Sequence, residues 1–128
     1  MKRFAIIALT LLAACKDETI SGYVAEDAVW RLETINGTSF NARATLTFPD
    51  PGKIAGQAPC NRYFGAQTAP YPWFTVQRII STKRACPDLK AETVFFKALK
   101  KMALSEVAGS TLILSNDSGD EMLFRAAE

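Results

Sequence analysis

The sequence predicts an α+β fold, in which a strongly curved, partly barrel-like antiparallel sheet of about six to seven strands packs on one α-helix. Two observations predict this fold. Beyond residue 28, most of the chain consists of short segments rich in β-branched, aromatic or alternating apolar residues, separated by turn residues. A single longer segment has helical periodicity. Because strands and helices do not alternate, the pattern excludes a parallel nucleotide-binding sheet.

Residues 29–35 (VWRLETI) form the first predicted strand, because Trp30 and Leu32 alternate with charged residues. Asn36-Gly37 follows this segment, and the pair is the strongest short signal for a hairpin turn. We therefore expect the chain to reverse its direction after this strand.

A hairpin is also predicted from residues 43–48 (RATLTF) and residues 53–58 (KIAGQA). The chain-breaking sequence Pro-Asp-Pro-Gly at residues 49–52 separates these two segments and predicts a loop. Gly56 lies inside the second segment, where a glycine indicates a bulge or a close approach of another backbone.

The next stretch, residues 61–72 (NRYFGAQTAPYP), is predicted to be irregular because Pro70 and Pro72 oppose regular structure. Residues 73–80 (WFTVQRII) follow as a strand, since they are rich in β-branched and aromatic side chains.

Residues 89–103 (LKAETVFFKALKKMA) form the one predicted helix. Pro87 and Asp88 suit its start, and Asp88 and Glu92 suit the positive end of the helix dipole. The expected buried stripe consists of Leu89, Phe96, Leu99 and Ala103, widened by Phe95 and Met102. A solvent-exposed face is expected from Lys90, Lys97 and Lys101.

A last hairpin is predicted at the C-terminal end of the chain. Gly109 ends the connection from the helix, and residues 111–116 (TLILSN) and 121–126 (EMLFRA) form two strands around a turn at residues 118–120.

The first residues of the chain have the pattern of a secretory signal peptide. Lys2 and Arg3 precede eleven apolar or small residues at positions 4–14. That run is too short for a membrane-spanning helix, which needs roughly 20 residues. The Leu12-Ala13-Ala14-Cys15 sequence resembles the bacterial lipobox, whose cysteine is acylated and becomes the new N-terminus.

The expected organisation is therefore a lipoprotein signal peptide at residues 1–14, an acylated Cys15 with a tether over residues 15–27, and one domain over residues 28–128. Several acyl chains on one cysteine hold a protein stably at a membrane. Lys16 follows the cysteine, and by the sorting rule of enteric bacteria this favours the outer membrane, facing the periplasm. The alternatives are an ordinary signal peptide with an accidental cysteine and a buried core segment.

The net charge of +2 belongs to the predicted signal peptide. Removal of Lys2 and Arg3 leaves 13 basic residues against 13 acidic ones. Without a basic patch with interleaved aromatic residues, we expect no nucleic-acid partner.

Cys60 and Cys86 have three possible roles. The sequence has no histidine, which excludes a Cys–His nucleophile. Two cysteines alone are too few for a structural zinc site, which takes four ligands. Since disulfides persist in exported proteins, we predict a disulfide between them, with two buried thiols as the alternative.

With these segments placed, the chain resembles the META domain of HslJ-like bacterial envelope proteins from about residue 29 to residue 124. The resemblance lies in Trp30-x-Leu32, Asn36-Gly37, ATLTF, GKIAG, Cys60-Asn61-Arg62-Tyr63, Gly65, Ser81-Thr82, Ala85-Cys86, Glu92, Phe95-Phe96, Leu99, TLIL and MLF. It implies a small strand-rich domain with one helix, often membrane-anchored and tied to stress and drug tolerance. It implies no catalytic residue.

A possible recognition loop consists of Asn61, Arg62, Tyr63, Tyr71 and Trp73, because aromatic residues on a proline-containing loop favour recognition. The alternative assigns the aromatic side chains to the core and Asn61 to a turn.

The function expected from the sequence is that of a non-enzymatic envelope lipoprotein acting through protein contacts in envelope maintenance or stress tolerance. We expect no cofactor and no metal site, a monomer, and partners among other envelope proteins. The alternative is an inhibitor of a secreted enzyme or a small-ligand binder, which would present residues 61–72 as an exposed rigid loop.

Overall fold

The computed structural model describes residues 17–126 of the chain. The predicted α+β class is confirmed, because the described part contains nine strands and one α-helix. The elements in order are η1 (Ile20–Gly22), β1 (Trp30–Ile35), β2 (Thr38–Ser39), β3 (Thr45–Leu46), β4 (Lys53–Gln57), β5 (Arg62–Ala66), β6 (Gln77–Ser81), α1 (Leu89–Lys101), β7 (Leu104–Ala108), β8 (Thr111–Ser115) and β9 (Glu121–Ala126).

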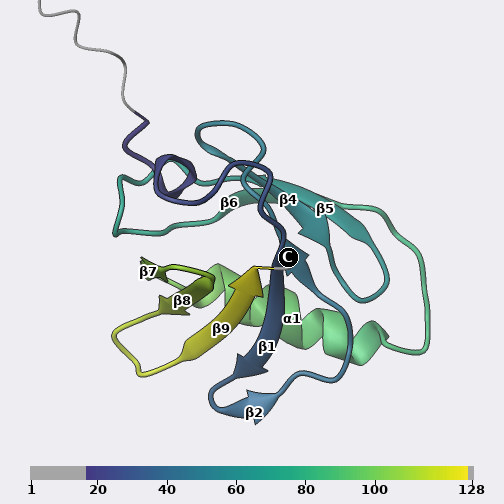
Figure 1. Cartoon of the computed structure of the whole chain (residues 1–128). Helices are drawn as coiled ribbons and strands as arrows, with labels where there is room; N and C mark the ends of the chain where they lie inside the picture. Colours follow the sequence, from purple (N-terminus) through teal and green to yellow (C-terminus); the bar gives the residue numbers. More distant parts are fainter. Residues whose placement is uncertain (1–16, 127–128) are drawn as a thin grey trace, which may run out of the picture.

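The strands form two antiparallel sheets rather than the one partly barrel-like sheet of six to seven strands that we expected. One sheet has the order β2-β1-β9-β8-β7, with β3 also paired to β1, and the other has the order β4-β5-β6. Figure 1 shows the three-stranded sheet above the six-stranded one, with α1 behind. Thr47 and Ala55 join the two sheets through a reciprocal pair of backbone hydrogen bonds of 2.7 and 3.0 Å.

The first strand has the predicted alternation. Trp30 and Leu32 are buried, and Arg31 is exposed. Asn36 and Gly37 have φ of 51° and 77°, so both adopt the left-handed conformation that a tight hairpin turn requires. Asn36 also binds the last hairpin, since its side-chain oxygen accepts a 2.7 Å hydrogen bond from the Glu121 amide.

The segment after the first hairpin is paired differently from our expectation. Its strand β3 contains only Thr45 and Leu46, and it pairs with β1 instead of forming a regular hairpin with β4. The close approach predicted at Gly56 is present, because a Cβ there would lie 2.1 Å from the Thr45 carbonyl oxygen. A larger residue at position 56 would therefore force β3 and β4 apart.

Two further predictions about strands need correction. Arg62–Ala66 is the central strand of the small sheet and not irregular, because β4 and β6 pair with it on both sides. Pro70 and Pro72 act only on the chain after it. Of the strand expected at residues 73–80, only the part from Gln77 onward is regular, as β6. Strand β7 was not predicted, because its inward positions include Ser105 whereas Leu104 is partly exposed.

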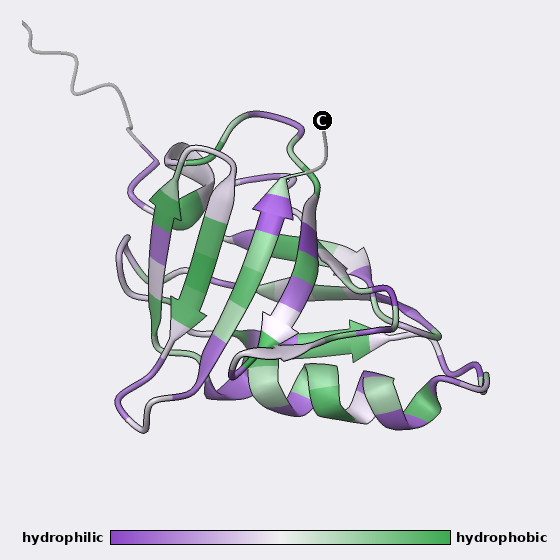
Figure 2. Cartoon of the chain, turned by 60° about the horizontal axis from the view of Figure 1, so that its bottom comes forward, coloured by the Kyte–Doolittle hydropathy of each residue, from purple (hydrophilic) through white to green (hydrophobic). Residues whose placement is uncertain are grey.

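The helix forms where it was predicted, but it is rotated relative to the expected stripe. Phe95 and Leu99 are fully buried, as expected. Leu89 is 44% exposed, and the charged Glu92 is buried in its place. Figure 2 shows the helix lying along the sheets, with hydrophobic and hydrophilic bands alternating around it. The rotation brings a carboxylate toward the sheets, which requires polar partners there.

The segment expected to be a tether instead packs on the domain. Ile20, in η1, is 1% exposed and belongs to the core. The Tyr71 amide donates a 2.7 Å hydrogen bond to the Glu18 carbonyl oxygen, and Thr19 forms a β-bridge with Pro70. The folded unit therefore begins by residue 17.

The buried hydroxyl of Tyr63 should stabilise the core through its hydrogen bond to Thr45. This hydroxyl donates a 2.6 Å hydrogen bond to the Thr45 carbonyl oxygen, and burial raises the pKa of Tyr63 far above its usual value. We expect Tyr63→Phe to lower the free energy of unfolding by about 1–2 kcal/mol at neutral pH. An unfolded tyrosine ionises near pH 10 whereas native Tyr63 stays neutral, so this side chain makes stability fall as pH rises above about 10.

The Phe variant lacks that ionisation, so the stability difference from wild type should shrink above about pH 10. Urea unfolding of both proteins at about pH 7 and about pH 11 measures it. A difference that stays constant across this pH range would contradict the assignment.

Candidate functional site

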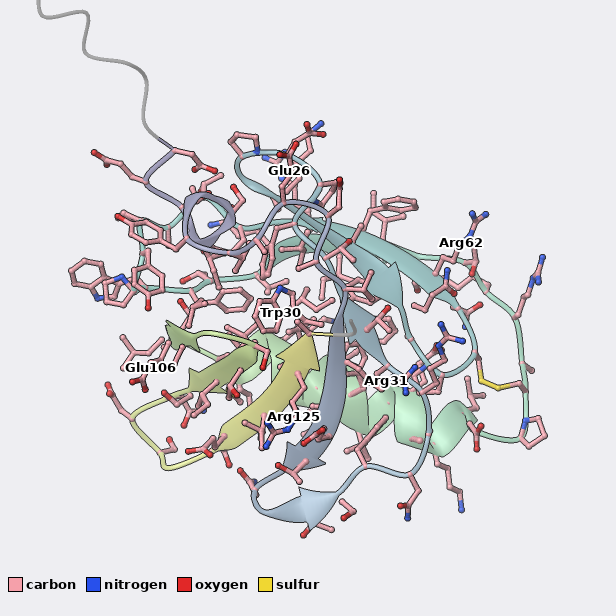
Figure 3. All side chains as sticks on the ribbon, in the orientation of Figure 1. Glu26, Trp30, Arg31, Arg62, Glu106 and Arg125 are labelled. Atoms are coloured by element: carbon pink, nitrogen blue, oxygen red, sulfur yellow. A yellow bond between two sulfur atoms is a disulfide. The ribbon has the colours of Figure 1, made fainter. Side chains whose placement is uncertain are left out.

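The predicted disulfide is present in the structure, and it lies beside a buried polar network. Cys60 and Cys86 are bonded, with 5.6 Å between their Cα atoms. The bond joins the turn between β4 and β5 to the segment before α1, as the yellow bond in Figure 3 shows. The other predicted cysteine site, Cys15, lies outside the described residues.

Asn61 is at the centre of this network and is 4% exposed. Its side-chain oxygen accepts hydrogen bonds from the Arg84 amide at 2.6 Å and the Thr82 hydroxyl at 2.8 Å. Its side-chain nitrogen donates to the Arg84 carbonyl oxygen at 3.0 Å and to Glu92 Oε2 at 2.7 Å. One amide side chain thus holds the segment that leads from β6 toward the helix.

Glu92 completes the network from the helix, where it is 6% exposed. Its Oε1 accepts hydrogen bonds from the backbone amides of Cys60 at 3.0 Å and Asn61 at 2.9 Å. A buried carboxylate bound by three N–H groups is well compensated without a cation. The sequence contained a signal for this role, because Glu92 falls between Leu89 and Phe96 on the expected apolar stripe.

A shallow cavity of about 370 Å³ opens beside the network and is lined by Asn61, Ser81, Thr82, Lys83, Arg84, Ala85, Leu89, Glu92, Thr93 and Phe96. The polar atoms of Asn61 and Glu92 already bind protein groups. Their arrangement can hold three segments together: the turn before β5, the segment after β6, and α1. It offers no unpaired carboxylate for proton transfer.

The five residues of the predicted recognition loop do not form one loop. Asn61 and Tyr63 are buried, and Arg62 is exposed on β5, where Figure 3 labels it. Tyr71 and Trp73 lie beyond the strand and in a different environment, next to β7. The prediction of a single loop is therefore wrong, and the structure divides it into the buried network and an aromatic surface.

This aromatic surface consists of Tyr23, Tyr71, Trp73 and Leu104. The rings of Tyr23 and Tyr71 stack with 4.4 Å between centroids and 18° between planes. Trp73 is 57% exposed and forms a β-bridge with Leu104. Tyr23 and Leu104 were not predicted to be part of a site, because they are distant along the chain from the residues they meet, Tyr71 and Trp73.

A second cavity, of about 490 Å³, lies near the start of the described chain and is partly acidic. Its charged lining residues are Asp17, Glu26, Asp27 and Asp50; Figure 3 labels Glu26 near the loop before β4. Among residues 17–126, no group of three or more histidine, cysteine or acidic side chains is arranged to hold a metal ion.

Asp17 has a local structural role at this cavity. Burial acts to raise the pKa of Asp17, but hydrogen bonds donated by Ser21 and Thr19 outweigh it, and the pKa of this carboxyl lies below its usual value. The carboxylate accepts bonds from the Thr19 amide at 2.9 Å, the Thr19 hydroxyl at 2.6 Å and the Ser21 hydroxyl. Asp17 therefore fixes the start of η1.

Comparison with solved structures shows that the fold is shared. An NMR structure of a protein from Burkholderia xenovorans matches with a TM-score of 0.67 and 22% identity, covering 84% of this chain and 86% of that one. A crystal structure of a DUF4847 family protein from Bacteroides vulgatus matches with a TM-score of 0.64 and 11% identity, covering 87% and 94%. A second NMR structure matches with a TM-score of 0.59 and 18% identity, and the match covers 77% of this chain and 87% of that one.

Comparison with family models gives a match to the META domain over residues 24–128. No curated protein matches the chain. Within the described residues, no helix has the length and apolar character that crossing a bilayer requires.

Proposed function

The chain belongs to the META domain family, and we propose that it is a membrane-anchored bacterial lipoprotein with a non-catalytic domain. The observation that carries the proposal is the Leu12-Ala13-Ala14-Cys15 sequence after a charged start and a short apolar run. The domain would act through contacts with other envelope proteins, in envelope maintenance or in stress and drug tolerance.

The use of cysteine supports the proposal. Of the three cysteines in the sequence, Cys60 and Cys86 form a disulfide, and such bonds persist in an oxidising compartment. Acylation of Cys15 would remove the remaining thiol. Lys16 after the acylated residue favours an outer-membrane location facing the periplasm.

A role in binding rather than catalysis is supported by the chemistry of the residues. The chain lacks histidine, the commonest general base. The buried carboxylate of Glu92 is bound to the backbone amides of Cys60 and Asn61. The inhibitor alternative is less favoured, because it needs an exposed loop at residues 61–72 and five of these residues form β5.

We expect Cys15→Ser to move the protein from the membrane fraction to the soluble fraction, because the thiol that carries the acyl chains is absent. Fractionation followed by intact mass measurement of the mature protein tests this. Lys16→Asp serves as the control, since it keeps the acylation site and should stay in the membrane fraction. Unchanged membrane association of Cys15→Ser would refute the anchor.

A further inference from the structure

We propose that the aromatic surface of Tyr23, Tyr71, Trp73 and Leu104 rests in the interfacial layer of the membrane that carries the lipid anchor. The inference rests on the proposed function, since it takes Cys15 to be acylated. It adds a second, non-covalent contact with the bilayer and fixes which side of the domain faces the lipid.

Only a short length of chain separates the anchor from this surface. Cys15 precedes Asp17 by two residues, which span at most about 7 Å when fully extended. The next residues are held against the aromatic surface, because Glu18 is hydrogen-bonded to the Tyr71 amide and Thr19 bridges to Pro70. Figure 1 shows the purple N-terminal segment beside the teal loop that leads to β6. A lipid on Cys15 therefore keeps this surface close to the bilayer.

The side chains of this surface suit the boundary between lipid and water. Tyrosine and tryptophan are enriched at the boundary between lipid and water, where an apolar ring and a polar group are both accommodated. Trp73 is 57% exposed, Tyr23 is 47% exposed and Leu104 is 36% exposed. These side chains leave apolar area in water that a lipid interface would cover.

Hydrogen bonds and ring stacking hold this surface in place. The Trp73 amide donates to the Pro70 carbonyl oxygen at 2.8 Å, and the Val107 amide donates to the Tyr71 hydroxyl at 3.1 Å. The stacking of Tyr23 on Tyr71 fixes the third ring. Little conformational freedom remains to be lost when the surface meets the bilayer, which favours binding.

Charge restricts the kind of lipid. Asp17, Glu18 and Glu26 lie in the segment that carries Tyr23, and they would be repelled by a strongly anionic surface. The surface therefore fits zwitterionic phospholipid. A second exposed apolar pair, Phe64 and Ile80, lies on the three-stranded sheet beside Arg62 and provides a matched control.

Tryptophan fluorescence tests the inference with the full acylated protein in phosphatidylcholine vesicles whose acyl chains carry bromine. The chain has two tryptophans, and Trp30 is 1% exposed in the core, so a lipid-borne quencher should act on Trp73. For the wild type, we expect brominated lipid to quench the tryptophan fluorescence, and we expect vesicle binding to protect that fluorescence from quenching by acrylamide. Trp73→Phe should lack both effects, and Phe64→Ser should keep both.

The outcomes separate the inference from the proposed function. An acylated, vesicle-bound protein whose Trp73 is not quenched by brominated lipid overturns the inference and leaves the anchor intact. The inference is also overturned if Phe64→Ser loses as much quenching by brominated lipid as Trp73→Phe does, since the contact would not then be specific to this surface. A mature protein without acyl chains, shown by intact mass, overturns the proposed function and the inference with it.

Discussion

Replacing Glu92 by alanine is expected to lower the free energy of unfolding by about 3 kcal/mol. The carboxylate accepts hydrogen bonds from the Cys60 amide, the Asn61 amide and the Asn61 side chain. Its removal leaves three N–H groups without their acceptor in a mostly buried site, and each such group costs about 1–3 kcal/mol when water does not replace the partner. Urea unfolding followed by circular dichroism measures the loss.

Two variants keep this prediction specific. Asp88→Ala, at the exposed N-cap of the same helix, removes a carboxylate whose side chain makes no capping hydrogen bond, and should change stability by less than about 0.5 kcal/mol. Glu92→Gln keeps an oxygen that can accept from the backbone amides, but it places its NH₂ group against the NH₂ group of the Asn61 side chain. The decrease in the free energy of unfolding should therefore lie between those of the two alanine variants. If alanine at 92 were as harmless as alanine at 88, the buried polar network around Asn61 and Glu92 would not stabilise the fold.

Asn61 should couple strongly to Glu92. The alanine variants of these two residues remove parts of one hydrogen-bonded unit, so their combined cost should be smaller than the sum of the separate costs. Additive costs in this double-mutant cycle would mean that the two side chains act independently.

Removal of the disulfide by Cys60→Ala with Cys86→Ala is expected to cost about 3–4 kcal/mol, because a link across 26 residues restricts the unfolded chain. For a domain of this size the melting temperature should fall by roughly 10–20 °C. Thermal unfolding by circular dichroism measures the shift.

Reductant provides the matched control for the disulfide. It should lower the melting temperature of the wild type toward that of the double variant and leave the double variant unchanged. A wild type insensitive to reductant after unfolding and refolding under reducing conditions would contradict a stabilising cross-link.

Local sequence patterns correctly predicted the strands, turns and helix that are specified by residues close together in the chain. The alternation around Trp30 and the conformational demand met by Asn36-Gly37 are each visible within a few residues. The helix over Leu89–Lys101 and the last hairpin follow for the same reason. The disulfide between Cys60 and Cys86 was predicted from the compartment and from the absence of other chemistry, not from geometry.

The sequence by itself predicted the α+β class and a disulfide between Cys60 and Cys86, and its motifs carried the resemblance to the family and to a lipoprotein signal peptide ending before Cys15. Only the tertiary structure decided which groups bind the Glu92 carboxylate, since the amides of Cys60 and Asn61 lie about thirty residues away along the chain. It also decided that Arg62–Ala66 is a strand and that Tyr23 meets Tyr71. Both outcomes depend on partners that are distant along the chain, and no local pattern carries information about which distant groups will meet.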